Sequence, residues 1–423
     1  MSVHSIFILN HSGEVQVEKH YRGLIQRTIC DAFTDELRKV EPSKDVQPLI
    51  ETPKYYLVSV AVNALFFLAV CPRDTDALMA MEFLNRIADV FRSYFGKDSP
   101  ITEETLKDNI FTIYQLLDEI GDGGAPFTTE PNVLKEMIVP PSFFGKVSDK
   151  ITGGGQSVST VIPDGLLTNV YWRRANAKYA SNEIYLDIVE FVHTTIDKNG
   201  LTLSSEVAGE LQCNSRLTGM PDLSLKFSNP SILDDVSLHP CVRFSRYDRE
   251  KIVSFIPPDG DFKLMDFRIV GNIQLPIYVK PTFYHTENGC RVQVVVGTKA
   301  NLLGERTIED IVVTIPFSKS TASFGLSSAN GGVLFDDATK ICTWTIGKLR
   351  SSSTTTVTLD GTIVNHVGTP RSDFNPIISL GFTVTGWSAS GLKIDSLLLF
   401  NEKYTPQKFM RSITKGGNVQ IRT

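Results

Sequence analysis

The stretch SNEIYLDIVE, residues 181–190, alternates apolar and polar side chains as a β-strand does. Residues two apart share one face of a pleated strand, so Tyr185 and Asp187 lie on one face and Leu186 lies on the other. Aspartate is poorly favoured within a strand. Asp187 is therefore either a solvent-facing residue near a strand end or a residue that the protein uses.

The chain around this strand, from Val170 onward, predicts an all-β fold. Short β-rich runs recur between turn signals, and we expect no helix among them. The turn signals are DKNG (197–200), PPDG (257–260), ENG (287–289) and ANGG (329–332). Many strands at such spacing indicate a large antiparallel sandwich of about 250 residues, elongated or built from two sub-sandwiches.

The first 137 residues predict strands followed by helices, an α+β arrangement with one face of the sheet covered. The predicted strands are SIFILN (5–10), EVQVEKHY (14–21) and two within 55–71 that meet at a tight turn at Asn63-Ala64. The predicted helices cover 22–39, 76–95 and 102–120. A capping-box pattern at Thr102 and Thr105 opens the last helix.

Residues 138–168 predict a flexible linker, because Pro140-Pro141 and a glycine triplet at 153–155 accompany little periodicity. We therefore expect domains at 1–137 and 169–423. Charge changes sign near the same place: 15 basic and 23 acidic residues lie in 1–167, against 27 and 24 in the remainder. The mildly basic half could approach an anionic membrane surface.

Composition indicates a soluble globular protein. Of 423 residues, 42% are hydrophobic and 21% are charged. The six cysteines are scattered without a CxxC pair, which argues against a zinc site or a disulfide framework and suits a reducing compartment. No secretory signal is visible, and the apolar run 55–71 is shorter than the ~20 residues of a spanning helix. We expect a cytosolic protein.

Catalytic motifs are missing from the sequence. It contains no GxSxG or HExxH, and no GxGxxG in a suitable context. Asp187 and His193 could form an acid/base pair, but no nucleophile accompanies them. We therefore expect no enzyme activity, no cofactor and no metal.

Several stretches are unusually distinctive. They are WRRANAKYASNEIYLDIVE (172–190), LTGMPDLSLKFSNPSILDD (217–235), HPCVRFSRYDREKIVSFIPPDGDFKLMDFR (239–268), SGLKIDSLLLF (390–400) and KGGNVQIRT (415–423). These stretches closely resemble the mu (medium) subunits of clathrin-type adaptor complexes, and the resemblance covers the whole chain. NPSILDDVSLHPCVRF and TKGGNVQIRT are most similar to the branch found in adaptor protein complex 3. The resemblance implies a longin-like domain at 1–137 and a mu homology domain at 169–423.

The resemblance also implies a function. Such a subunit reads Tyr-x-x-Φ signals, where Φ is a bulky apolar residue, in cytosolic tails of membrane proteins. Its expected partners are two large subunits (beta and delta type), a small sigma subunit and, through the complex, an Arf-type GTPase and an anionic membrane. The expected location is the cytosolic face of Golgi and endosomal membranes and coated vesicles, with transport towards lysosomes or vacuoles. The alternative is a structural subunit with a degenerate signal site.

Two pockets follow from the resemblance. The matches for the tyrosine pocket are Tyr185, Asp187, Phe409 and Arg411. The matches for the Φ pocket are Ile184, Leu186, Asn214, Ile394, Leu397 and Met410. The best-studied members of the family carry tryptophan where Phe409 stands and lysine where Asn214 stands.

The spacing of the tyrosine-pocket residues agrees with this assignment. Phe409 and Arg411 are two apart, so a second strand also offers an aromatic and a charge on one face. Two such strands side by side would form a slot with aromatic walls and an Asp/Arg floor, suited to a tyrosine ring and its hydroxyl. We expect the peptide to add as an edge strand. Without this function, the same charges would form a surface ion pair worth about 0–1 kcal/mol.

Overall fold

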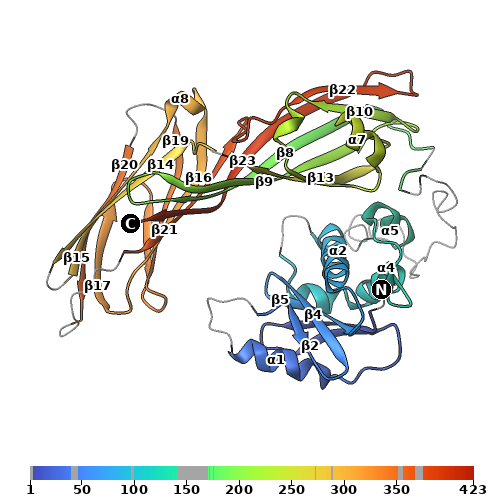
Figure 1. The fold of residues 1–423 in the computed structure, drawn as a ribbon, viewed down its shortest axis with the longest axis horizontal. Coiled ribbons are helices and arrows are strands. Elements are labelled where there is room, and N and C mark those ends of the chain that lie inside the picture. The colour runs from blue at the N-terminus through green and yellow to red at the C-terminus, as the bar shows by residue number, and fades with distance from the viewer. Residues whose placement is uncertain are drawn as a thin grey trace, which may run out of the picture. The chain divides into compact units, whose positions relative to one another are not determined.

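The computed structural model describes residues 3–39, 46–96, 100–138, 140, 170, 172–174, 176–271, 273–286, 289–350, 356–366 and 375–423. The chain divides into two compact units, Met1–Arg174 and Ala175–Thr423, and each is described by itself (Figure 1). Apart from 138 and 140, the linker expected over 138–168 lies outside the described residues. The expected domain bounds therefore stay predictions.

The first unit is a five-stranded antiparallel sheet with helices on both faces. In spatial order its strands are β2 (Val15–His20), β1 (Ser5–Asn10), β5 (Leu65–Pro72), β4 (Tyr55–Val62) and β3 (Leu49–Glu51). The helices are α1 (Ile29–Lys39), α2 (Ala77–Phe95), α3 (Glu103–Asp108), α4 (Ile110–Ile120) and α5 (Pro131–Met137). A short hairpin, β6 (Gly121–Asp122) and β7 (Ala125–Pro126), follows α4.

Both faces of this sheet are covered, so the expectation of one covered face was wrong. Phe7 of β1 packs in a core with Phe33 of α1. Ile8, its neighbour in β1, packs on the other face with residues of α2 and α4. All six residues of β1 are therefore buried, which a strand covered on one side alone would not show.

The predicted hairpins are confirmed, and two predicted helices differ. Asn63 makes the turn between β4 and β5 with a φ of 55°, which asparagine tolerates better than most residues. The helix expected from residue 22 begins only at Ile29, after Gly23 takes a φ of 71°. The helix expected over 102–120 opens on the capping box but breaks at Asn109, whose amide donates to the carbonyl of Thr105.

The described strands of the second unit form three sheets. The nine-stranded sheet contains, in spatial order, β11 (Asp235–Leu238), β13 (Gly260–Val270), β9 (Thr202–Arg216), β8 (Glu183–Ile196), β23 (Gln407–Arg422), β21 (Ile377–Thr385), β16 (Thr307–Pro316), β19 (Ile341–Arg350) and β18 (Gly332–Asp336). The three-stranded sheet contains β12 (Val253–Phe255), β10 (Asp222–Phe227) and β22 (Ile394–Phe400). The four-stranded sheet contains β14 (Ile277–Thr286), β15 (Gly289–Thr298), β20 (Thr356–Asn365) and β17 (Thr321–Ser328).

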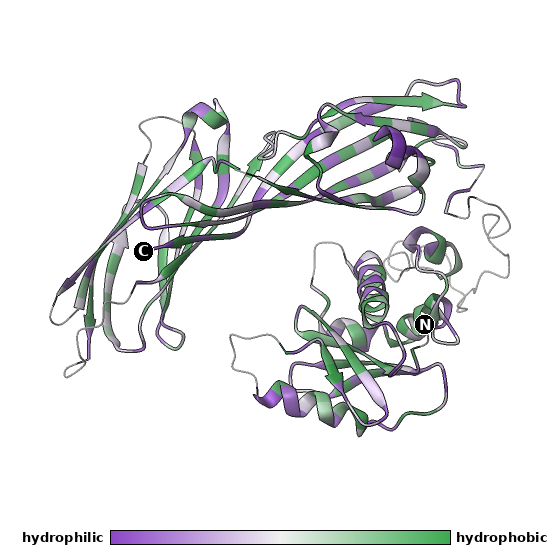
Figure 2. Ribbon diagram, viewed as in Figure 1, coloured by the Kyte–Doolittle hydropathy of each residue, from purple (hydrophilic) through white to green (hydrophobic). Residues whose placement is uncertain are grey.

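These sheets form two sub-sandwiches that share the long strands β8, β9 and β23 (Figure 1). The first sub-sandwich places β10, β12 and β22 over one end of the nine-stranded sheet. The second places the four-stranded sheet over the other end. Apolar and polar residues alternate along these strands (Figure 2), and in β8 Ile184 and Leu186 are fully buried while Tyr185 is exposed. The alternation read from the sequence is therefore the burial pattern of the strand.

Two expectations for this unit need correction. Short helices are present, namely α7 (Phe244–Glu250) and α8 (Ala300–Leu303), both too short to show helical periodicity in the sequence. Among the strands that the structure describes in this unit, one pair is parallel, β8 with β23. A parallel pair needs a long crossover connection, and here almost the entire unit provides it.

Candidate functional site

The parallel pairing of β8 and β23 brings the four predicted tyrosine-pocket residues together. Phe409 lies opposite Tyr185, and Arg411 lies opposite Asp187. Met410, between Phe409 and Arg411 in the chain, lies opposite Leu186, and both point to the other face. We call Tyr185, Asp187, Phe409 and Arg411 the tyrosine-side group, and their face of the sheet the outer face.

Asp187 and Arg411 form a two-point ion pair on the outer face. The Nε of Arg411 donates to one carboxylate oxygen at 2.8 Å, and Nη2 donates to the other at 2.5 Å. Because the carboxylate stabilises the charged guanidinium, the pKa of Arg411 is raised. Each oxygen of Asp187 still has a lone pair for a further donor.

Tyr185 and Phe409 stack on one another beside this ion pair. Their ring centroids are 4.6 Å apart and their planes differ by 12°. Rings in such contact leave no room for a third ring between them, so the expected pair of facing walls is one two-ring wall. The Tyr185 hydroxyl donates to Glu183 at 2.8 Å, and this bond raises the pKa of Tyr185.

Five of the six residues predicted for the Φ pocket lie on the opposite, inner face. Ile184, Leu186 and Leu397 are buried between the sheets, Ile394 is half-buried, and Met410 is 41% exposed. We call these five the Φ-side group. Ile394 and Leu397 are three apart on β22, a spacing that would put them on opposite faces of a regular strand. A β-bulge between them brings both inward, opposite Phe227 and Leu225.

Asn214 does not join the Φ-side group. It lies opposite Tyr185 in the antiparallel β8–β9 pair, so it shares the outer face. Its amide donates to Asp261. The register of β8 and β9 decides this placement, and the sequence alone does not reveal that register.

Two strand edges are open beside the site. On the side away from β8, β23 pairs with β21 only from Ile413 onward, and among the described residues no strand pairs with that edge of 407–411. β22 is the outer strand of its own sheet. Lys408 spans the two edges, because its ammonium donates to the Leu397 carbonyl at 2.6 Å. Sequence reasoning missed Lys408, which no motif marks.

The structure offers no support for the acid/base pair. Asp187 and His193 are six residues apart on one strand, a separation of about 20 Å. His193 accepts a hydrogen bond from the Asn418 N–H instead. Across the described part of the chain, no three His, Cys, Asp or Glu residues are grouped as metal ligands, and no helix is long and apolar enough to cross a membrane.

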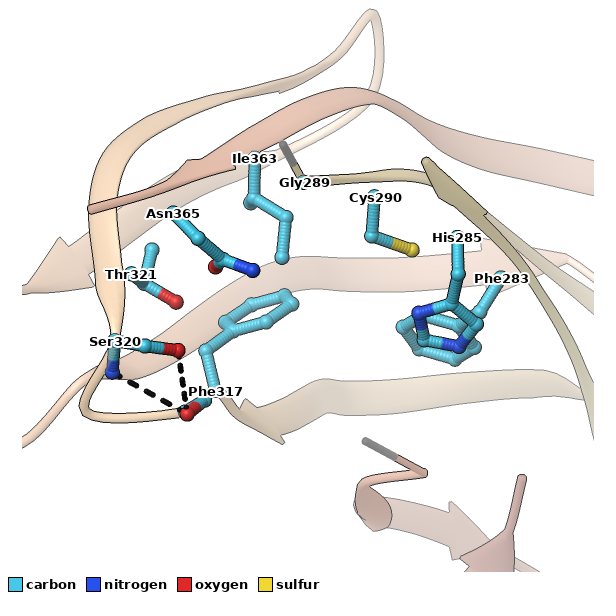
Figure 3. Close-up of a pocket in the computed structure, with 10 residues that line it drawn as sticks. Phe283, His285, Gly289, Cys290, Phe317, Ser320, Thr321, Ile363 and Asn365 are labelled. Atoms are coloured by element: carbon cyan, nitrogen blue, oxygen red, sulfur yellow. Dashed lines mark hydrogen bonds between the residues drawn. The ribbon is translucent and has the colours of Figure 1, made fainter. Parts of the chain in front are cut away.

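A small pocket lies in the second sub-sandwich (Figure 3). Phe283, Cys290, Phe317 and Ile363 give it apolar walls. Thr321, which is 1% exposed, has a hydroxyl without a hydrogen-bond partner among the described residues. The lining strands β14, β15 and β20 contain none of the residues of either group, so this pocket is separate from the site.

Comparison with known proteins identifies the class to which this chain belongs. Residues 2–139 match the clathrin adaptor complex small chain, and residues 170–423 match the adaptor complexes medium subunit family. The second match covers more than half of the chain, which therefore belongs to the adaptor complexes medium subunit family. This membership confirms the expected fold, a longin-like unit followed by a β-rich mu homology domain.

Within the family, the chain is similar to subunits of AP-3 complexes. It is 43% identical to the AP-3 complex subunit mu of Dictyostelium discoideum, over 99% of each chain. It is 40% identical to the AP-3 complex subunit mu-1 of Homo sapiens, over 100% of each. A chain in a homology model of the full-length AP-3 complex in an intermediate open conformation has the same fold, with a TM-score of 0.62, 16% identity and 99% of each chain covered.

The family consists of adaptor subunits, and this agrees with the expectation that the chain is not an enzyme.

Proposed function

We propose that this chain reads Tyr-x-x-Φ sorting signals in cytosolic tails of membrane proteins, as the medium subunit of an AP-3-type coat adaptor. The observation that carries the proposal is the register of β8 and β23. It places the Asp187–Arg411 ion pair beside the Tyr185–Phe409 stack, next to an open strand edge. An aromatic surface, a charged acceptor and a backbone edge are together what recognition of an extended tyrosine peptide needs.

The signal tyrosine lies against the two-ring wall rather than within it. Its hydroxyl donates to Asp187 and accepts from Arg411, and its ring lies over the ion pair and against the rim of the stack. A hydroxyl that is both donor and acceptor fits this pair of charges, and phenylalanine does not. Phosphotyrosine is rejected, because its added negative charge meets Asp187.

The spacing of the signal matches the two faces of the site. In an extended peptide, Tyr and Φ are three positions apart and therefore point to opposite faces. A peptide added to the edge of 407–411 directs tyrosine to the outer face, beside Arg411. It directs Φ to the inner face, where Met410 and Ile394 leave apolar surface exposed. One strand edge thus serves both side chains.

The remaining parts of the proposal rest on the family resemblance, and the similarity to AP-3 mu subunits supports a place in such a complex. The partners are two large subunits of beta and delta type and a small sigma subunit. An Arf-type GTPase and anionic lipids recruit the complex to the cytosolic face of Golgi and endosomal membranes, for transport to lysosomes or vacuoles. Co-purification of the tagged chain from its own cytosol tests these partners.

Titration calorimetry on the full chain tests the signal site. A Tyr-x-x-Leu peptide should bind, and the same peptide with phenylalanine or phosphotyrosine should bind much more weakly. The closed Tyr185–Phe409 stack favours one second candidate, a structural subunit whose signal site is degenerate. That candidate is correct if no such peptide binds while the chain still assembles with its partner subunits.

A further inference from the structure

Glu190 is a buried carboxylate on the inner face of β8. It is 0% exposed, and its position two residues after Ile188 places it on the face of the Φ-side group. A buried charge is costly unless hydrogen bonds satisfy it. Its donors among the described residues are neutral hydroxyl and backbone N–H groups. The arrangement of those partners indicates what the residue does.

One loop, 387–392, supplies most of the donors to Glu190. Ser388 and Ser390 donate their hydroxyl protons to the same oxygen, Oε1, at 2.9 and 2.5 Å. The N–H of Ala389 donates to Oε2 at 2.6 Å. This loop connects β21 of the nine-stranded sheet to β22 of the three-stranded sheet. Glu190 is therefore hydrogen-bonded to the loop that connects the two sheets.

Ser390 links Glu190 to the residues that lead into β22. Its hydroxyl oxygen accepts the N–H of Leu392 at 3.0 Å, and Leu392 is fully buried. β22 begins two residues later, at Ile394. Ser388 also donates to Glu190, and its oxygen lies 3.3 Å from that of Ser390, whose single proton is already donated to Glu190. The two serines thus share one acceptor, and Ser390 adds a bond to the residue that leads into β22.

Thr414 of β23 closes the cluster from the other side. It lies opposite Glu190 in the parallel register and is fully buried. Its hydroxyl donates to the Trp387 carbonyl at 2.9 Å, and its oxygen lies 3.3 Å from Oε2 of Glu190. β8, β23 and the approach to β22 therefore meet at one carboxylate.

We infer that Glu190 is a positioning residue that fixes β22 opposite the open edge of β23, and so sets the Φ side of the signal site. The inference rests on the proposed function. Glu190 is three residues from Asp187, about 10 Å along the strand and on the opposite face. Its loss should therefore alter selection at Φ and leave selection of tyrosine intact. A residue needed for stability alone would weaken both by the same factor.

Binding measurements on the full chain test the inference. The probes are a Tyr-x-x-Leu peptide, its Phe-x-x-Leu form and its Tyr-x-x-Ala form. In Glu190→Gln, an amide of nearly the same shape places N–H groups against N–H and O–H donors. The preference for Leu over Ala at Φ should fall about fivefold or more, and the preference for Tyr over Phe should stay within about twofold.

Two serine variants serve as a matched pair. Ser390→Ala should lower the Φ preference as Glu190→Gln does, because it removes the bond to Leu392. Ser388→Ala removes one donor to the same oxygen and should leave the Φ preference nearly unchanged. Ser390→Ala also decides the question if Glu190→Gln does not fold. The inference is overturned if both preferences fall together, if neither falls, or if the two serine variants behave alike.

Hydrogen exchange separates this inference from the proposed function. If the wild-type chain binds none of the peptides, the proposed function fails. Exchange of the amides of 392–399 then decides the role of Glu190. Faster exchange in Glu190→Gln and Ser390→Ala, but not in Ser388→Ala, supports positioning of β22. Unchanged exchange in all three variants overturns it.

Discussion

Lys408 of β23 donates its ammonium to the main-chain carbonyl of Leu397 in β22 at 2.6 Å, so that one side chain spans the two open strand edges. The side chain is exposed, and the bond joins elements that no strand pairing connects. Lys408 lies two residues before Met410 and therefore on the same face of β23, at what we call the mouth of the Φ-side group. Under the proposed function, we therefore expect Lys408 to limit which side chains can enter between β22 and β23.

Lys408→Ala should broaden selection at Φ. Removing the stem and the ammonium widens the mouth, so the affinity for Phe at Φ should rise relative to Leu. Because the residue is exposed, we expect a stability loss of at most about 1 kcal/mol. Peptide titrations and urea unfolding measure the two effects. Lys226→Ala, which removes an exposed lysine from β10, is the control and should change neither; an unaltered Phe-to-Leu ratio in Lys408→Ala would contradict the prediction.

Asp187→Ala should abolish recognition of the signal tyrosine and leave the fold intact. A hydrogen bond to a charged group is worth about 1.5–3 kcal/mol, which corresponds to a roughly ten- to hundredfold loss of affinity. Calorimetry with tyrosine and phenylalanine peptides completes a double-mutant cycle. In the variant, the change from tyrosine to phenylalanine should matter little, because the bond is already lost. Equal binding of the two peptides by the wild-type chain would exclude the role given to Asp187.

The six cysteines should be unreactive in the native protein. All are free and buried, and burial raises the pKa of Cys30, Cys71 and Cys342 to about 12. The reactive thiolate is therefore scarce at neutral pH. A colorimetric thiol reagent should modify the native chain slowly and all six thiols in denaturant. Rapid modification of two or more native thiols would mean that the cores open readily.

The same thiols predict a loss of stability in alkaline solution. Between the unfolded pKa of 9.0 and the folded value of about 12, the unfolded chain releases protons that the native chain retains. The free energy of unfolding should therefore fall as pH rises through this window. Below pH 9 the thiols are protonated in both states, and the stability that they contribute should be fully present. Urea unfolding at several pH values measures the slope. Simultaneous Cys→Ser replacement of the three residues should reduce that slope.

Limited proteolysis should cut first within 138–168. The prediction comes from the Gly-, Pro- and Ser-rich composition of that stretch. A resistant fragment beginning near Thr168 should accumulate, and N-terminal sequencing identifies it. First cuts within 172–268 would place the domain boundary elsewhere.

Local structure followed from local sequence, and the site did not. The β4–β5 hairpin and the strand at 183–196 were predictable, because alternation and turn residues report on neighbours along the chain. The pairing of Arg411 with Asp187 joins residues 224 positions apart, and only the family resemblance brought them together beforehand. The side of the sheet on which Asn214 lies depends on the register of β8 and β9, and the side on which Ile394 lies depends on a β-bulge. No pattern in the sequence predicts that register or that bulge.

The two groups lie on opposite faces of one strand edge, and under the proposed function this arrangement would make the site selective for the conformation of the peptide backbone. In a helix, residues three apart lie on the same side, so a helical tail would present Tyr and Φ together and could satisfy only one group. A Tyr-x-x-Φ sequence would therefore act as a signal when the tail is extended and would not be read when the tail is helical. A membrane protein could prevent recognition of its sorting signal by forming one turn of helix at that signal.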